Sequence, residues 1–206
     1  MGAVVFNKAK ELFFTYGLKS ISMDDLAKES GVSKKTIYQA VADKQELVAK
    51  VVEDLVHCHK EAVATSSRSA VNAIDELVHF SCLPFDTWAA ININFFYELE
   101  KFFPMEWKKL MTHRSQFMQP AIVKNLKRGI AEGLYRDDLD IELTANIRLQ
   151  QIATALKPVD FSERKLEPRR LMNDLTLFYL HGIVTTKGKR FINKYLNLNN
   201  ENRTIQ

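Results

Sequence analysis

The amino-acid sequence predicts an all-α fold, with a small N-terminal helical head and a larger helical bundle behind it. Residues that break helices are scarce, with 7 Gly and 5 Pro in 206 residues. Apolar residues recur at helical spacing, and 46% of the chain is hydrophobic, which is enough for a packed core. The composition excludes collagen, low-complexity disorder and disulfide-stapled mini-proteins.

The N-terminal segment predicts two helices with recognisable ends. Apolar residues from Val5 to Tyr16 share one helix face, and Gly17 supplies a left-handed stop. Ser22 and Asp25 have the spacing of a capping box, in which each side chain bonds to a free amide of the other residue. This box predicts the start of a second, short helix.

The second helix and the one after it have the pattern of a helix-turn-helix. Such a pair needs a small residue at the crossing and a turn residue that tolerates positive φ, and Ala27 and Gly31 meet these needs. Ser33 caps the third helix, over 34–39. Apolar anchors lie on both sides of the turn: Leu26, Val32 and Ile37. In a helix-turn-helix the second helix enters the major groove of DNA, whereas a plain helical hairpin has no such role.

The remainder of the chain predicts further helices. A capping box at 43–46 begins a long helix that passes residue 55, and a loop is expected at 66–69. The other helices are expected over 71–82, 86–103, 105–132, 141–156 and 169–186, with a polar connector at 157–168. The helix over 105–132 is either continuous or interrupted at Pro120, which also suits the first turn of a new helix.

Charge and cysteine content suggest the setting of the protein. The net charge is +4, with +2 in residues 1–50, −2 in 51–186 and +4 in 187–206, which permits a polyanionic partner without requiring one. Cys58 and Cys82 lie far apart, as expected in a reducing, cytoplasmic compartment. The N-terminus lacks a signal peptide, and no apolar run is long enough to span a membrane, so we expect no membrane partner.

Metal, cofactor and enzyme motifs are not expected. The run His57-Cys58-His59 resembles a ligand cluster, but residues i and i+2 of a helix point about 200° apart. Glu76 and His79 have the spacing of a carboxylate-bundle metal motif, which needs a second copy that the sequence lacks. Phosphate-binding glycine loops and nucleophile motifs are also missing.

Residues 9–47 resemble the N-terminal domain of TetR-family transcriptional regulators. The segments that carry the resemblance are AKELF (9–13), YGL (16–18), SMDDLA (22–27), GVSKKTIY (31–38) and DKQEL (43–47). A second segment, over 129–145, resembles the loop and helix start that precede the dimerisation helices of that family. The chain departs from the family at 39–41, where Gln-Ala-Val replaces an aromatic or His pair followed by Phe. This departure leaves more of the DNA affinity to lysines and makes it sensitive to salt.

The resemblance implies a homodimeric DNA-binding regulator, with a DNA-binding domain over 1–46 and an effector-binding and dimerisation domain over 47–206. A repressor is expected, which a small hydrophobic or aromatic effector releases from a palindromic operator. The expected base contacts are Lys35, Thr36 and Gln39, the expected phosphate contacts are Ser22, Ser33, Tyr38 and Lys44, and Lys34 suits either role. The alternatives are a helical protein-interaction module and a DNA-binding protein without an effector.

Aromatic residues are concentrated between 85 and 117, where nine of the chain's 21 occur. They form either ordinary core, a subunit interface or an apolar effector pocket. The pocket would be lined by Phe85, Trp88, Phe95, Phe96, Phe102, Phe103, Trp107 and Phe117, with Asn92 and Glu98 to orient a polar group of the ligand. The dimer surface is expected on the helices over 142–156 and 169–186. Its candidates, some of which could instead face the protomer's own core, are Ile147, Ile152, Leu171, Leu175, Phe178 and Tyr179.

Overall fold

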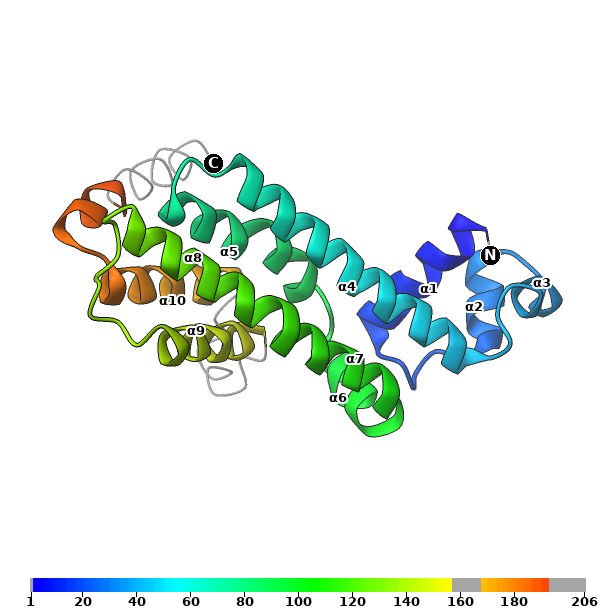
Figure 1. The fold of residues 1–206 in the computed structure, drawn as a ribbon. Helices are drawn as coiled ribbons and strands as arrows, with labels where there is room; N and C mark the ends of the chain where they lie inside the picture. Colours follow the sequence, from blue (N-terminus) through cyan, green and yellow to red (C-terminus); the bar gives the residue numbers. More distant parts are fainter. Residues whose placement is uncertain (1, 157–167, 193–206) are drawn as a thin grey trace. The chain divides into compact units, whose positions relative to one another are not determined.

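The computed structural model describes residues 2–156 and 168–192, and over these residues the protein is all-α, as the sequence predicts (Figure 1). The helices are α1 (Ala3–Tyr16), α2 (Met23–Ser30), α3 (Lys34–Tyr38), α4 (Lys44–Ser69), α5 (Ala73–Ala89), α6 (Ile93–Phe102), α7 (Pro104–His113), the π-helical turn η1 (Arg114–Met118), α8 (Gln119–Ala131), α9 (Ile141–Leu156) and α10 (Pro168–Ile183). Within the same ranges, β-structure is limited to one isolated bridge between Tyr135 and Val184. None of the described helices is both long and apolar enough to cross a membrane.

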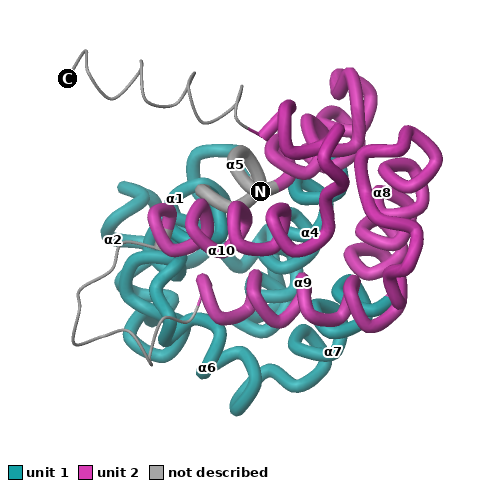
Figure 2. The backbone as a smooth tube through the Cα atoms, turned by 90° about the vertical axis from the view of Figure 1, so that its left-hand side faces the viewer, with its two compact units in different colours: residues 1–61, 87–115 teal, residues 62–86, 116–206 magenta. Residues whose placement is uncertain are grey.

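The chain forms two compact units (Figure 2). Unit 1 comprises residues 1–61 and 87–115, and unit 2 comprises residues 62–86 and 116–206. Unit 1 therefore combines the three N-terminal helices and most of α4 with α6 and α7. Unit 2 is built mainly from α5, α8, α9 and α10.

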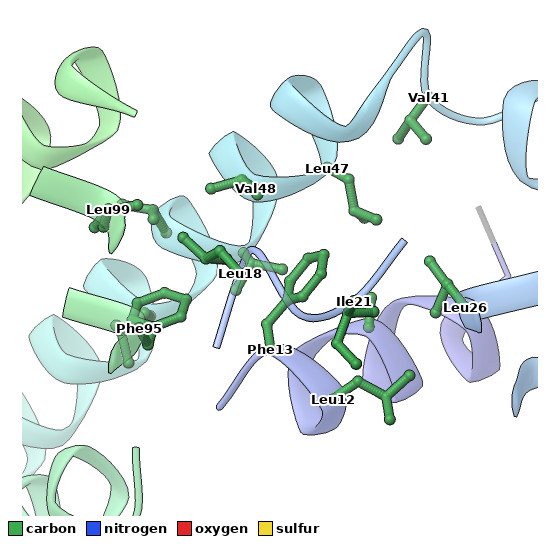
Figure 3. Packing of buried hydrophobic residues seen from close by; sticks show 14 of the residues in the cluster. Leu12, Phe13, Leu18, Ile21, Leu26, Val41, Leu47, Val48, Phe95 and Leu99 are labelled. Carbon is green, nitrogen blue, oxygen red and sulfur yellow. The ribbon is translucent and has the colours of Figure 1, made fainter. Parts of the chain in front are cut away.

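The core of unit 1 joins α1 to α4 and α6. Phe13 of α1 is 1% exposed, and it lies among apolar side chains from the α1–α2 turn and from α4 (Figure 3). Phe95 and Leu99 of α6 are both fully buried in the same cluster. The other members that Figure 3 labels are Leu12, Leu18, Ile21, Leu26, Val41, Leu47 and Val48. The predicted apolar faces of α1 and α4 are thus the faces that pack, except that Tyr16, at the end of the predicted α1 face, is 57% exposed.

The helix ends of the N-terminal segment follow the local signals in the sequence. Gly17 ends α1 with φ of +86°, and Gly31 ends α2 in the left-handed region with φ of +65°. The predicted capping box is present, because the Ser22 hydroxyl accepts from the Asp25 amide and the Asp25 carboxylate accepts from the Ser22 amide. After Gly31 the Val32 amide donates to the Ala27 carbonyl at 3.0 Å, which closes the turn of the helix-turn-helix.

Three element boundaries differ from the prediction. The loop expected at 66–69 is wrong, because α4 continues to Ser69, and the hydroxyls of Ser66 and Ser69 bond back to carbonyls four residues earlier, at 2.9 and 3.1 Å. α5 passes Pro84 and ends at Ala89. The next helix begins after Asn92, whose side chain caps it, rather than at residue 86.

Other element boundaries agree with the sequence-based prediction or lie outside the residues that the structure describes. The long region over 105–132 is broken by the π-helical turn, and a proline stands in the first turn of α8, as one of the two alternatives requires. The Asp140 carboxylate accepts from the Leu143 amide at 3.0 Å and so caps α9, as predicted. The expected connector at 157–168 lies outside the described residues except for its last position.

A buried polar network joins the helices of unit 2. The Glu76 carboxylate is 4% exposed and accepts from the Ser67 hydroxyl at 2.6 Å, the Asn125 amide at 3.0 Å and the Arg128 guanidinium at 3.1 Å. The Tyr135 ring is 1% exposed, and its hydroxyl donates to the Ala73 carbonyl at 3.0 Å. These bonds satisfy polar groups that would otherwise be buried at a large cost.

Gly129 allows the Tyr135 ring to lie directly against α8. A Cβ at residue 129 would lie 2.0 Å from a carbon of that ring, so we expect Gly129→Ala to lower the free energy of unfolding by about 3 kcal/mol. Gly182 of α10 has nothing within 4 Å of its Cβ position, so Gly182→Ala should raise that free energy by about 0.5–1 kcal/mol. Urea unfolding of both variants tests this, and equal stabilities would contradict it.

Candidate nucleic-acid interface, effector residues and pairing face

α3 is a short helix with one buried anchor and an exposed polar side. Ile37 is 1% exposed and belongs to the core of unit 1, which fixes the rotation of the helix about its axis. The polar residues that the sequence assigns to DNA are all exposed around it: Ser33, Lys34, Lys35, Thr36, Tyr38 and Gln39. The structure therefore brings the predicted reading residues together on one accessible surface.

Several of these residues also have partners within the head. The Lys34 ammonium pairs with the Asp24 carboxylate of α2. The Ser33 hydroxyl accepts from the Thr36 amide at 3.2 Å and lies 2.9 Å from the Thr36 hydroxyl. These contacts orient the first turn of α3 before any ligand arrives. A pre-oriented surface loses less side-chain entropy when it binds.

Lys44 has a structural contact that sequence reasoning did not anticipate. Its ammonium is half-buried and donates to the carbonyls of Leu18 and of Ile21, the latter at 2.6 Å. Burial lowers the pKa of this lysine. Because two of its three N–H groups bind the α1–α2 turn, at most one points elsewhere. The phosphate contact expected for Lys44 stays a prediction. In the structure, this side chain holds the turn between α1 and α2.

The segment that departs from the family pattern is packed and bonded. Val41 is 3% exposed, so it fills part of the core beneath the head. The Ala40 carbonyl accepts from the Lys50 ammonium at 3.0 Å. The start of α4 follows the predicted capping box with one change, because the Glu46 carboxylate accepts from the amide of Ala42 rather than from that of the N-cap residue.

The centre of the aromatic cluster is packed core of unit 1. Phe95 is fully buried and Phe96 is 5% exposed, and their rings meet edge to face with centroids 5.4 Å apart. Phe95 also meets Phe14 of α1 edge to face at 5.1 Å, and Trp88 stacks on Phe96 at 5.9 Å. For Phe95 and Phe96 the structure thus supports ordinary core, which was one of the alternatives.

The outer members of the aromatic cluster are more accessible. Phe102 is 42% exposed, and the Lys19 ammonium lies 4.4 Å from its ring centroid. The side chain of Phe85 lies outside the described residues. The remaining predicted pocket residues are half-buried: Trp88, Phe103, Trp107 and Phe117. Of these, Phe117 belongs to unit 2 and the others to unit 1.

The two polar residues expected to orient a ligand both bind the main chain, and their role at a ligand stays a prediction. The Asn92 side chain caps α6 and donates to the Thr15 carbonyl at 2.9 Å. The Glu98 carboxylate accepts from the Lys19 amide at 2.8 Å. Both contacts join α6 to the end of α1 and the turn that follows it.

A histidine pair, one residue buried and the other half-buried, was missed by the sequence reasoning. His113 of α7 is 4% exposed, and its Nε2 lies 3.0 Å from the Nδ1 of His59 of α4. Burial is the main cause that lowers the pKa of each imidazole to about 4; the other imidazole adds to this at His59, and the Lys60 charge adds to it at His113. His113 lies three residues after the buried Leu110, a helical spacing that could have indicated an inward position. Among the described residues, no group of three or more possible metal ligands comes together.

The α9 and α10 helices carry an exposed apolar face. Ile147 is 47% exposed and Phe178 is 76% exposed, and both were expected on the dimer surface. An open groove of about 400 Å³ is lined by Leu143, Asn146, Ile147, Gln150, Gln151, Thr154 and Leu175. Leu171 and Tyr179 are only 6% and 4% exposed and belong to the protomer's own core, and Ile152 is partly buried and packs against that core.

The anchored α2–α3 pair, with polar side chains exposed on its second helix, defines the head as a helix-turn-helix of the kind that binds DNA. Residues 5–51 match the family described as bacterial regulatory proteins, tetR family. The family resemblance predicted from the sequence is therefore confirmed for the head. No curated protein sequence matches the chain.

The fold of the chain is similar to that of several solved proteins described as transcriptional regulators. The chain is 15% identical in sequence to SCO4454, a TetR-family regulator from Streptomyces coelicolor. The TM-score is 0.70, and the match covers 87% of this chain and 92% of that one. FadR from Bacillus subtilis, solved with stearoyl-CoA, is 16% identical, with a TM-score of 0.66 over 87% and 98%. A protein from Saccharomonospora viridis, solved with choline, is 18% identical, with a TM-score of 0.75 over 88% and 96%. At these identities the likeness establishes the fold.

The histidine pair predicts how stability depends on pH. Because the pKa of both imidazoles is lowered to about 4 in the folded chain, protons bind the unfolded chain more readily, near its ordinary pKa of 6.5. The contribution of the pair is complete above about pH 6.5 and is lost as the pH falls from there towards about 4. We therefore expect the thermal midpoint to fall over this range, and His113→Phe should flatten that fall.

The matched control for this measurement is His57→Gln, because His57 is an exposed residue on the same helix as His59. It should leave the pH profile of the thermal midpoint unchanged. A wild-type midpoint that stays constant between pH 6.5 and 4.5 would contradict the burial argument.

Proposed function

We propose that this chain is a transcriptional regulator that binds operator DNA as a homodimer and represses until a small hydrophobic effector releases it. The observation that carries the proposal is the exposed row of Lys35, Thr36 and Gln39 on a helix whose other side is locked into the core by Ile37. This arrangement lies within the segment that matches the tetR family. We assign DNA reading to residues 1–46, and effector binding and dimerisation to 47–206.

DNA reading follows from the chemistry of the exposed row. A lysine donates to the O6 and N7 acceptors of guanine in the major groove, and a glutamine matches the N6 and N7 of adenine. Lys35 and Gln39 are one helical turn apart, so both face the same stretch of groove. Two heads in a symmetric dimer would read half-sites about one helical turn (~34 Å) apart or somewhat more.

The exposed face of α9 and α10 supports pairing with a second copy. Contiguous apolar surface on a water-exposed face is costly, and a two-fold axis lets the same patch cover itself. Phe178 projects from this face, and the neighbouring groove has apolar walls at Leu143, Ile147 and Leu175. A bundle of two α9 and two α10 helices would bury these residues.

Release by an effector needs a ligand that prefers one conformation. To change a population from 1:99 to 99:1, the ligand must bind the favoured state more tightly by roughly 5.5 kcal/mol. Two proteins of similar fold were solved with stearoyl-CoA and with choline, which supports a ligand site in this fold. The half-buried rings of Trp88, Phe103 and Trp107, all of unit 1, support an effector with apolar surface.

Selection of a duplex from a random library, followed by gel shifts across a salt series, tests the DNA-binding function. We expect one near-palindromic sequence to be enriched and its affinity to fall steeply with salt. Lys35→Ala should reduce discrimination against a changed base pair by about 1–3 kcal/mol, because it removes a base contact. Lys108→Ala, an exposed lysine on α7, is the matched control and should leave discrimination unchanged. Unaltered discrimination in Lys35→Ala would remove this residue from base readout.

The pairing face predicts the oligomeric state of variants. Phe178→Lys introduces a charge on the apolar face and should convert the proposed dimer to a monomer in sedimentation equilibrium at micromolar concentration. Val71→Lys is the matched control, because Val71 is 79% exposed and lies outside that face, in the segment before α5. A Phe178→Lys chain that stays dimeric would show that the dimer forms through another surface.

A further inference from the structure

The turn between α1 and α2 is held on two sides by opposite charges. The Glu98 carboxylate of α6 accepts from the Lys19 amide at 2.8 Å. The Lys44 ammonium of α4 donates to the carbonyls of Leu18 and Ile21. Glu98 and Asp25 are the carboxylates that act on the Lys44 charge. The main chain of one short turn thus gives a hydrogen to α6 and receives hydrogens from α4.

The close approach of α6 to this turn depends on Gly17. A Cβ at this position would lie 2.9 Å from the Glu98 Oε2, and φ of +86° disfavours any residue with a side chain. The carboxylate therefore lies directly against the main chain, with no side chain between them. Such a contact transmits a displacement of α6 to the turn with little slack.

A second tie runs from the start of α6 to the end of α1. The Asn92 amide donates to the Phe14 carbonyl at 2.7 Å, and the Asn92 side chain donates to the Thr15 carbonyl at 2.9 Å. The Phe14 ring meets Phe95 of α6 edge to face at 5.1 Å. Hydrogen bonds from α6 and its N-cap residue therefore reach the main chain at residues 14, 15 and 19, and α2 begins four residues after Lys19, at Met23.

We infer that Glu98 is the positioning residue that couples the position of α6 to the orientation of the helix-turn-helix. Its carboxylate fixes the Lys19 amide, and hence the path by which the chain enters α2 and α3. Anything that shifts or stiffens α6 then changes the orientation of the reading helix, and DNA on the reading helix stiffens α6 in return, because coupling between two sites is reciprocal. This inference rests on the proposed function, since it assigns to that function a residue that acts through the main chain of the turn.

Hydrogen exchange of the full-length chain tests the inference, with and without the duplex selected as above. In the free chain, Glu98→Ala should speed exchange at residues 17–21 about tenfold, because a charged acceptor is lost. In the wild type, saturating duplex should slow exchange both in the head and in α6. In Glu98→Ala the duplex should still slow exchange in the head but no longer in α6. Glu98→Gln keeps an acceptor oxygen and should restore most of the α6 response.

The matched control is Glu100→Gln, because Glu100 is an exposed residue of α6. It should behave as the wild type in every measurement. Persistent slowing of α6 by duplex in Glu98→Ala, or its absence in the wild type, overturns the coupling. If no duplex binds the wild type, the proposed function fails. The coupling is then judged in the free chain, where unchanged exchange at 17–21 in Glu98→Ala overturns it and tenfold faster exchange supports it.

Discussion

The burial of the apolar face of α1 is the constraint on which the rest of unit 1 depends. Phe13 cannot be covered by the short helices α2 and α3 alone, because each supplies only one turn or two of side chains. Coverage comes from the long α4 and, from a distant part of the sequence, from Phe95 and Leu99 of α6. Once α1 is fixed in this way, the turn that follows it and the path into α2 are fixed as well.

The same packing explains why polar residues of α3 remain on the surface. A helix of five residues has too few side chains for two apolar faces, and α3 uses its one strong anchor, Ile37, for the core. Its other side chains are left for water or for a ligand. The short length of α3 is therefore possible because the long helix α4 supplies apolar side chains to the core of the head.

Local signals in the sequence predicted the head accurately, because capping and turn chemistry act over a few residues. The Ser22–Asp25 capping box and the positive φ of Gly31 are examples. Contacts between distant residues were not accessible in this way. The carbonyl contacts of Lys44 and the main-chain contact of Glu98 depend on how α4 and α6 approach a turn far away in sequence. Patterns of residue type suggested ligand roles for both side chains, which stay predictions, but could not indicate these main-chain contacts.

The small size of α3 limits how specifically one head could recognise a DNA sequence. A recognition helix of five residues presents only about three or four side chains to base edges, so the short sequence that it would read recurs by chance throughout any chromosome. One head alone would bind at many non-target sites. In the proposed dimer, two heads would read two half-sites at a fixed separation, and a matching pair of half-sites is much rarer than one. The selectivity would then depend on the spacing between the subunits as well as on the side chains that contact the bases.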